Sequence, residues 1–179
     1  MKEVNVLYTE PTRLEPTRLL SDETIAILNY RIEQEQYSSR IYEQISMWLE
    51  NEGFNNLSKL YKKYASEELG HGEWAKTYLL SYDITPSLHP LKTPLEECTC
   101  SNIKEILDLT LKHELEVTSQ CEALTKFAME TSQFNLFSLG QRYNAEQIEE
   151  IEKATTLVSL YKHSKDDLIF DSYIGENYN

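Results

Sequence analysis

The chain has 179 residues, and its 30 Asp and Glu against 17 Lys and Arg give a formal net charge of −13 with His neutral. This length fits one ordinary domain, and 40% hydrophobic and 11% aromatic residues are typical of a globular protein rather than a disordered one. The shortage of Lys and Arg argues against a nucleic-acid partner, because those side chains supply most of the affinity for phosphates. An acidic chain is instead suited to binding cations.

Two sorting signals are missing from the sequence. No apolar run approaches the roughly 20 residues that cross a bilayer, and the first 20 residues lack the apolar stretch and cleavage site of a signal peptide. We therefore expect a cytoplasmic protein with no membrane partner. The odd cysteine count, Cys98, Cys100 and Cys121, contains no Cys-x-x-Cys pair and indicates reduced thiols.

Long segments free of helix breakers dominate the chain. It contains only five Gly and five Pro, and the prolines lie near the start and between residues 86 and 94. The intervening segments are rich in Leu, Glu, Lys and Gln, which favour helix. Ser21 is the expected N-cap of the first helix, and residues 51–53 end it. The pattern predicts four long helices and a short fifth, at residues 22–50, 54–81, 101–130, 133–161 and 166–173.

The connections between these helices define a topology. The first and second helices, like the third and fourth, are joined by a few residues, so each pair should form an antiparallel hairpin. A helix of about 28 residues is about 42 Å long. The 18 residues from 83 to 100 can span up to about 60 Å, so they can run the full length of the molecule. The prediction is an all-α four-helix bundle with one long crossover. We expect an extended N-terminal arm at 1–20, the bundle at 21–162, and a C-terminal helix and tail at 163–179.

Each long helix carries polar residues in the middle of its apolar face. Residues spaced by three and four along each segment are mostly Leu, Ile, Val, Ala and Tyr, which marks the buried face. The residues that interrupt these faces are Glu35, Glu68, His71, Glu114, Gln147 and Glu150. Any one of them alone has an ordinary explanation as a solvated edge residue. Interruptions at mid-length in all four helices instead favour one shared site.

The charge of this shared site indicates metal ions. A buried carboxylate costs several kcal/mol unless it is compensated, and no Lys or Arg lies on the same helix faces as Glu35, Glu68 and Glu114. Two divalent ions would supply four positive charges against these three negative ones. The imidazole of His71 favours iron over calcium or magnesium. We therefore predict a dinuclear iron site, with Glu68 and His71 one turn apart and Glu68 bridging the ions.

At these residues the chain resembles the bacterial non-haem ferritins. The resemblance covers residues 21–161, and its motifs lie on four separate helices in the same order and spacing. The matching stretches are Leu28-Asn29, EQYSS at 35–39, Tyr42, Trp48, EELGH at 67–71, His113-Glu114 and AEQIEE at 145–150. The resemblance implies a ferritin-like four-helix bundle with a short C-terminal fifth helix.

The resemblance also implies an iron storage protein with ferroxidase activity, and it assigns residues to that function. Fe(II) would be oxidised to Fe(III) by O2 or H2O2 at two iron sites per subunit, with a third iron nearby and no haem. The oxidised iron would be stored as ferric oxide mineral in a hollow homo-oligomer of 24 subunits. The first iron would be bound by Glu35, Glu68 and His71, and the second by Glu68, Glu114 and Gln147. The third would be bound by Glu67, Glu146, Glu149 and Glu150. Tyr42 would take part in electron transfer.

Three other readings are less consistent with the sequence. A rubrerythrin-like di-iron oxidoreductase that retains its metals would have a second Glu-x-x-His, but Val117, Glu149 and Lys153 stand at the i+3 positions after Glu114, Glu146 and Glu150. A DNA-protecting mini-ferritin would need a basic tail or surface. A metal-free shell subunit would have lost part of the ligand set.

The N-terminal arm contains a tandem repeat, EPTRL at 10–14 and again at 15–19. We expect it to lie as an extended strand on the exterior of the shell, with docking to another protein as the alternative.

Overall fold

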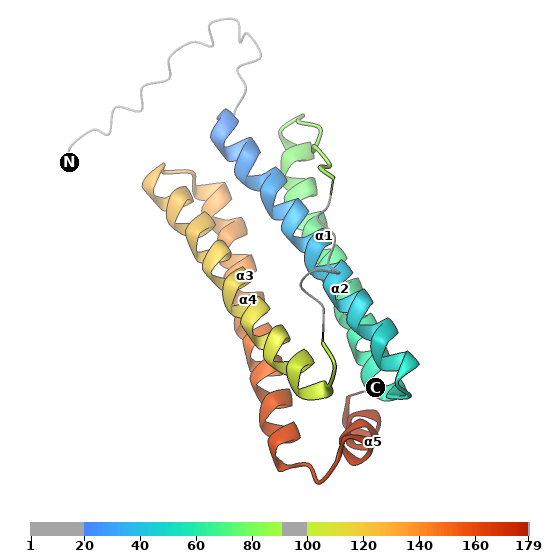
Figure 1. The fold of residues 1–179 in the computed structure, drawn as a ribbon. Helices are drawn as coiled ribbons and strands as arrows, with labels where there is room; N and C mark the ends of the chain where they lie inside the picture. The colour runs from blue at the N-terminus through green and yellow to red at the C-terminus, as the bar shows by residue number, and fades with distance from the viewer. Residues whose placement is uncertain (1–19, 91–99, 179) are drawn as a thin grey trace, which may run out of the picture.

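The structure is a computed structural model that describes residues 20–90 and 100–178. It confirms the predicted all-α class: within the described residues there are five helices and no strand. Figure 1 shows α1 and α2 as one antiparallel pair beside the pair formed by α3 and α4, with α5 across one end. None of the described helices combines the length and apolarity of a bilayer-crossing segment. The helices are α1 (Asp22–Asn51), α2 (Asn55–Ser81), α3 (Ile103–Glu130), α4 (Phe134–His163) and α5 (Asp167–Asn177).

Side-chain caps fix where two of the long helices begin. The Ser21 hydroxyl accepts a hydrogen bond from the backbone N–H of Thr24 at 3.1 Å, as predicted for the N-cap of α1. Asn102 does the same for α3, accepting from the backbone N–H of Glu105 at 2.9 Å. The cap therefore starts α3 two residues later than the sequence predicts. At the α1–α2 turn Gly53 has φ +89°, a conformation that side chains disfavour.

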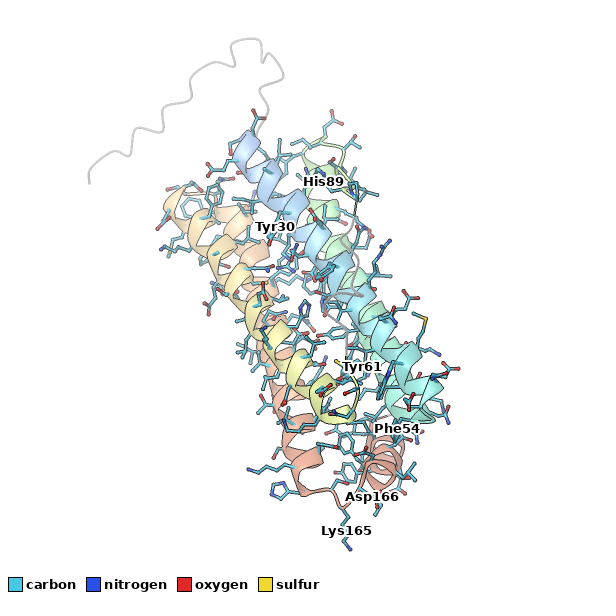
Figure 2. All side chains as sticks on the ribbon, viewed as in Figure 1. Tyr30, Phe54, Tyr61, His89, Lys165 and Asp166 are labelled. Carbon is cyan, nitrogen blue, oxygen red and sulfur yellow. The ribbon has the colours of Figure 1, made fainter. Side chains whose placement is uncertain are left out.

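The N-terminus of α2 is capped from a distance. Its N-cap residue, Phe54, makes no side-chain capping bond. Instead the carboxylate of Asp171, on α5, accepts from the backbone N–H groups of Asn56 at 3.1 Å and Leu57 at 2.8 Å. Figure 2 shows Phe54 and the turn at Asp166 at the same end of the bundle. α5 is thus tied to the α1–α2 hairpin, and it is longer than predicted.

The apolar core is divided into two clusters. The first, which we call the α5-side cluster, includes Ile41, Leu49, Leu60, Leu107 and Phe170. The second, the distal cluster, includes Leu28, Ile32, Leu79, Leu124 and Leu136. In each long helix a gap separates the two clusters, and buried polar side chains fill it. We call this region, at mid-length of the bundle, the polar layer. Its members from the four long helices include Glu35, Glu68, His71, Thr110, Glu114, Gln147 and Glu150.

Two sequence predictions concern residues outside this description. The N-terminal arm with its EPTRL repeats lies outside the described residues, and so does Cys98. Within the described residues Cys100 is half-buried and Cys121 is buried, and neither forms a disulfide.

Candidate metal centre

The polar layer brings together the carboxylates that the sequence singles out. Glu35, Glu68 and Glu114, from α1, α2 and α3, are no more than 3% exposed, and His71 is 7% exposed. Glu35, Glu68 and His71 each offer a ligand atom, and these atoms all lie within 4.8 Å of one another. Residues of α1 and α2 therefore form one cation-sized cluster, and the buried Glu114 of α3 belongs to the same polar layer.

Glu114 and Gln147 bring α3 and α4 to the same layer. The hydroxyl of Tyr42 donates a hydrogen bond to Oε1 of Glu114. The hydroxyl of Thr118, one turn after Glu114, lies 3.0 Å from Oε1 of Gln147, which is also buried. Tyr42 is fully buried, and burial followed by the charge of Glu114 raises its pKa well above the usual value. It is therefore a neutral hydrogen-bond donor.

Several carboxylate oxygens in and beside the polar layer lack a donor. Oε2 of Glu35, Oε2 of Glu114 and Oε2 of Glu67 are buried and accept no hydrogen bond in the described structure. A buried acceptor without a donor costs about 1–3 kcal/mol, and more when it is charged. Metal cations satisfy such oxygens directly. The side chains present therefore fit iron or another divalent cation.

The pKa values of the carboxyl groups in this layer also favour a bound metal ion. Burial, followed by the charges of Glu35 and Glu114, raises the pKa of Glu68 well above its usual value. Burial raises the pKa of Glu114 to about 7, although the hydrogen bond from Tyr42 acts in the opposite direction. Without a cation, protons neutralise part of this layer. A metal ion that enters would replace those protons.

One prediction about the charge of the layer is wrong. The sequence indicated no Lys or Arg to balance the three carboxylates, yet Arg31 is buried and its Nε lies 2.8 Å from Oε1 of Glu35. Its Nη1 donates to Gln120 at 3.0 Å, and its guanidinium lies 5.8 Å from the centre of the Tyr143 ring. Arg31 sits at the flank of the apolar face, but its long side chain reaches inward. The sequence feature that indicates this ion pair is the i,i+4 spacing of Arg31 and Glu35.

The ion pair gives the two oxygens of Glu35 different surroundings. Oε1 faces the guanidinium of Arg31, whereas Oε2 is the oxygen that accepts no hydrogen bond. A metal ligand at this position is therefore best supplied by Oε2. Arg31 meanwhile holds the carboxylate in place.

His71 lies between this cluster and a second group of carboxylates. Its Nδ1 lies 3.2 Å from Oε2 of Glu68, and its Nε2 lies 3.6 Å from Oε1 of Glu146. The ring packs on Trp74 with centroids 4.9 Å apart, and the backbone carbonyl of His71 accepts from the hydroxyl of Tyr143. Both ring edges of His71 thus face carboxylates.

The residues predicted for a third iron are brought together only in part. Ligand atoms of His71, Glu146 and Glu150 lie within 4.8 Å of one another. Glu67 joins them through Lys153, whose Nζ lies 3.7 Å from its Oε2. Glu149 is exposed and belongs to neither group of possible metal ligands found among the described residues. We call Glu67, Glu146 and Glu150 the outer carboxylate cluster.

The sequence did not predict that Lys153 lies beside the outer carboxylate cluster. Its Nζ lies 2.8 Å from Oε1 of Glu150, so an ammonium group occupies the space between carboxylates from α2 and α4. The i,i+3 spacing of Glu150 and Lys153 was visible in the sequence. The contact with Glu67 on another helix required the structure.

Known proteins match this chain over most of its length. The Ferritin family model, a ferritin-like domain, matches residues 25–163. The chain is 30% identical over 132 residues to the probable bacterial non-heme ferritin-like protein of Haemophilus influenzae, across 74% of this chain and 79% of the relative. It is 26% identical over 169 residues to bacterial non-heme ferritin of Bacteroides fragilis, across 88% and 99%.

A solved structure supports the fold. The open pore ferritin of the archaeon Archaeoglobus fulgidus superposes with a TM-score of 0.81 at 23% identity, covering 87% of this chain and 96% of that one. The matched region contains all four long helices except the first few residues of α1, and with them the polar layer. The chain therefore belongs to the ferritin family and is a relative of the bacterial non-heme ferritins.

Proposed function

We propose that this chain is the subunit of an iron-storage ferritin and that it oxidises Fe(II) at a paired site in the polar layer. The observation that carries the proposal is the meeting of Glu35, Glu68 and His71 in a gap between two apolar clusters that also contains the buried Glu114. Carboxylate oxygens of Glu35 and Glu114 there accept no hydrogen bond. Arg31 pairs with only one of the three buried carboxylates, so such a cluster is unfavourable without a further cation. Similarity to bacterial non-heme ferritins supports iron as that cation.

In this proposal each side chain has a defined part. One Fe(II) is bound by Oε2 of Glu35, by the carboxylate of Glu68 and by the imidazole of His71. The second is bound by Glu68, Glu114 and Gln147. Carboxylate oxygens stabilise Fe(III) more than Fe(II), because the more highly charged ion gains more from anionic donors. Two Fe(II) ions supply two electrons, which with two protons reduce O2 to H2O2 or reduce H2O2 to two water molecules. The neutral amide of Gln147 makes the second site the weaker one, which suits release of oxidised iron.

The remaining parts of the proposal follow the relatives rather than the geometry. We propose a cytoplasmic homo-oligomer, a hollow shell of 24 subunits that stores iron as ferric oxide without haem. The match to bacterial non-heme ferritins over most of the chain supports this assembly. We propose that Tyr42, whose hydroxyl donates a hydrogen bond to Glu114, takes part in electron transfer at this site.

Stopped-flow absorbance of the iron-free protein tests the proposal. Two Fe(II) per subunit are added in air to the wild type, to Glu68→Gln with His71→Ala, and to Glu73→Gln. Glu73 is exposed on the same helix, where it pairs with Lys76, so it controls for loss of one negative charge. We expect a rapid rise of ferric absorbance in wild type and Glu73→Gln.

In the double variant we expect the rate to fall at least tenfold, because two ligands of the first iron are missing. Equal slow rates in all three proteins would overturn the proposed ferroxidase activity. Circular dichroism and gel filtration of each variant confirm that helix content and assembly size are unchanged.

A further inference from the structure

The outer carboxylate cluster already contains a cation of the protein's own. Nζ of Lys153 lies 2.8 Å from Oε1 of Glu150 on the same helix and 3.7 Å from Oε2 of Glu67 on α2. Its ammonium group also lies 5.9 Å from the centre of the Tyr64 ring. Lys153 therefore bridges α2 and α4 at the place where the sequence predicts a third iron.

A metal ion and this ammonium group would compete for the same carboxylate. Glu150 accepts a hydrogen bond from Lys153 through Oε1, and it is also one of the three residues that could hold a metal together with His71 and Glu146. A divalent ion at that position would stand beside a positive charge, and the two would repel each other. Stable metal binding there requires Lys153 to move away.

Lys153 differs in this respect from Arg31, the other cation near the polar layer. The Arg31 side chain is only 3% exposed, and it contacts both Glu35 and Gln120. The Lys153 side chain is 33% exposed, and its flexible stem can carry the ammonium outward. The Arg31 guanidinium is a fixed part of the site, whereas the Lys153 ammonium can be displaced.

We propose that Lys153 is an internal counter-ion of the outer carboxylate cluster, which iron must displace and which restricts tight metal binding to the paired site. This inference rests on the proposed function, because it assumes that the neighbouring pair binds metal. Its consequence is a protein with two tight sites per subunit and a third position that iron crosses without being retained.

Equilibrium binding of Zn(II) to the iron-free assembled protein tests the inference without any redox reaction. A chelator-buffered titration counts only tight sites and ignores weak binding to the acidic surface. We expect two Zn(II) per subunit for wild type and three for Lys153→Met, which keeps most of the length of the side chain and removes its charge. Lys153→Arg, which keeps the charge, should remain at two.

Lys63 offers a matched control. It lies 3.9 Å from Oε1 of Glu67, but its side chain is 62% exposed, so Lys63→Met should leave the count at two. Three tight sites in wild type, or a count that Lys153→Met does not change, would overturn the inference.

A second set of variants distinguishes failure of this inference from failure of the proposed function. In Glu35→Gln with Glu68→Gln the paired site is disabled, yet Lys153→Met should still add one Zn(II) per subunit, because the outer carboxylate cluster is intact. No added Zn(II) in this background would overturn the role of Lys153. Failure of the paired site itself shows instead as fewer than two Zn(II) in wild type.

Discussion

Buried charge governs the behaviour of individual residues in the polar layer. Glu35, Glu68, Glu114 and Glu150 are all buried, and Arg31 is the fixed cation among them. Carboxylates in such surroundings take up a proton, pair with a cation or bind a metal. Each of these responses can be measured in the iron-free protein.

Loss of Arg31 should destabilise the iron-free protein. Arg31→Met leaves Glu35 buried without its counter-ion, and removal of one partner of a buried pair costs about 3 kcal/mol. Thermal unfolding of the iron-free protein should show a clearly lower Tm for this variant. Zn(II) should recover most of the loss, because a bound ion takes over the charge balance of Glu35.

Arg40→Met is the control for Arg31, because Arg40 lies exposed on the same helix. It should leave Tm nearly unchanged. Equal Tm values for the two variants would show that the ion pair of Arg31 and Glu35 contributes nothing to stability.

The raised pKa values predict how stability depends on pH. Burial raises the pKa of Glu114 from 4.5 to about 7, so between these two values the folded protein holds a proton that the unfolded chain has released. Stability from this group is complete below pH 4.5 and is lost as pH rises toward 7, a loss of about 3 kcal/mol. Glu68, whose pKa is also raised, acts in the same direction.

Chemical denaturation of the iron-free protein between pH 5 and 8 checks this dependence, with Glu114→Gln as the comparison. The variant should lose less stability across this range than the wild type, because its amide does not ionise. Identical slopes for the two proteins would show that Glu114 is ionised in the folded iron-free state.

At the scale of elements, the sequence predicted the long helices well because each carries a continuous helical periodicity, and Ser21 and Gly53 mark the two ends of the first. The apolar faces also located Glu35, Glu68, His71 and Glu114 within the bundle. What periodicity could not predict depends on side-chain reach between elements. Lys153 meets Glu67 across two helices, and Asp171 caps a helix more than a hundred residues earlier in the chain.

The cap formed by Asp171 is open to a direct test. Asp171→Ala removes the acceptor for the backbone N–H groups of Asn56 and Leu57, and loss of a helix cap typically costs about 1–2 kcal/mol. Hydrogen exchange at those two amides should accelerate, and Tm should fall. Glu176→Ala, at an exposed position on α5, should change neither. Unchanged protection in Asp171→Ala would show that α5 does not stabilise the start of α2.

At the scale of the whole molecule, the division of the core explains how a metal centre is built into a helical bundle. The α5-side cluster and the distal cluster supply apolar packing at both ends. That packing holds the four helices close enough for the polar layer to remain buried between them. The sequence predicted this layer from four separate interruptions. Arg31 lies off the apolar face, and only its i,i+4 spacing from Glu35 indicated the ion pair.

Anomalous diffraction from crystals of the iron-free protein soaked in Zn(II) or in Fe(II) without oxygen tests the central claim most directly. We predict two strong metal peaks per subunit in the polar layer, one among Glu35, Glu68 and His71, and one between Glu68 and Glu114. The ion pair of Arg31 and Glu35 should persist beside the first peak. Metal peaks found only outside the polar layer, with these side chains unchanged, would contradict the proposed paired iron site.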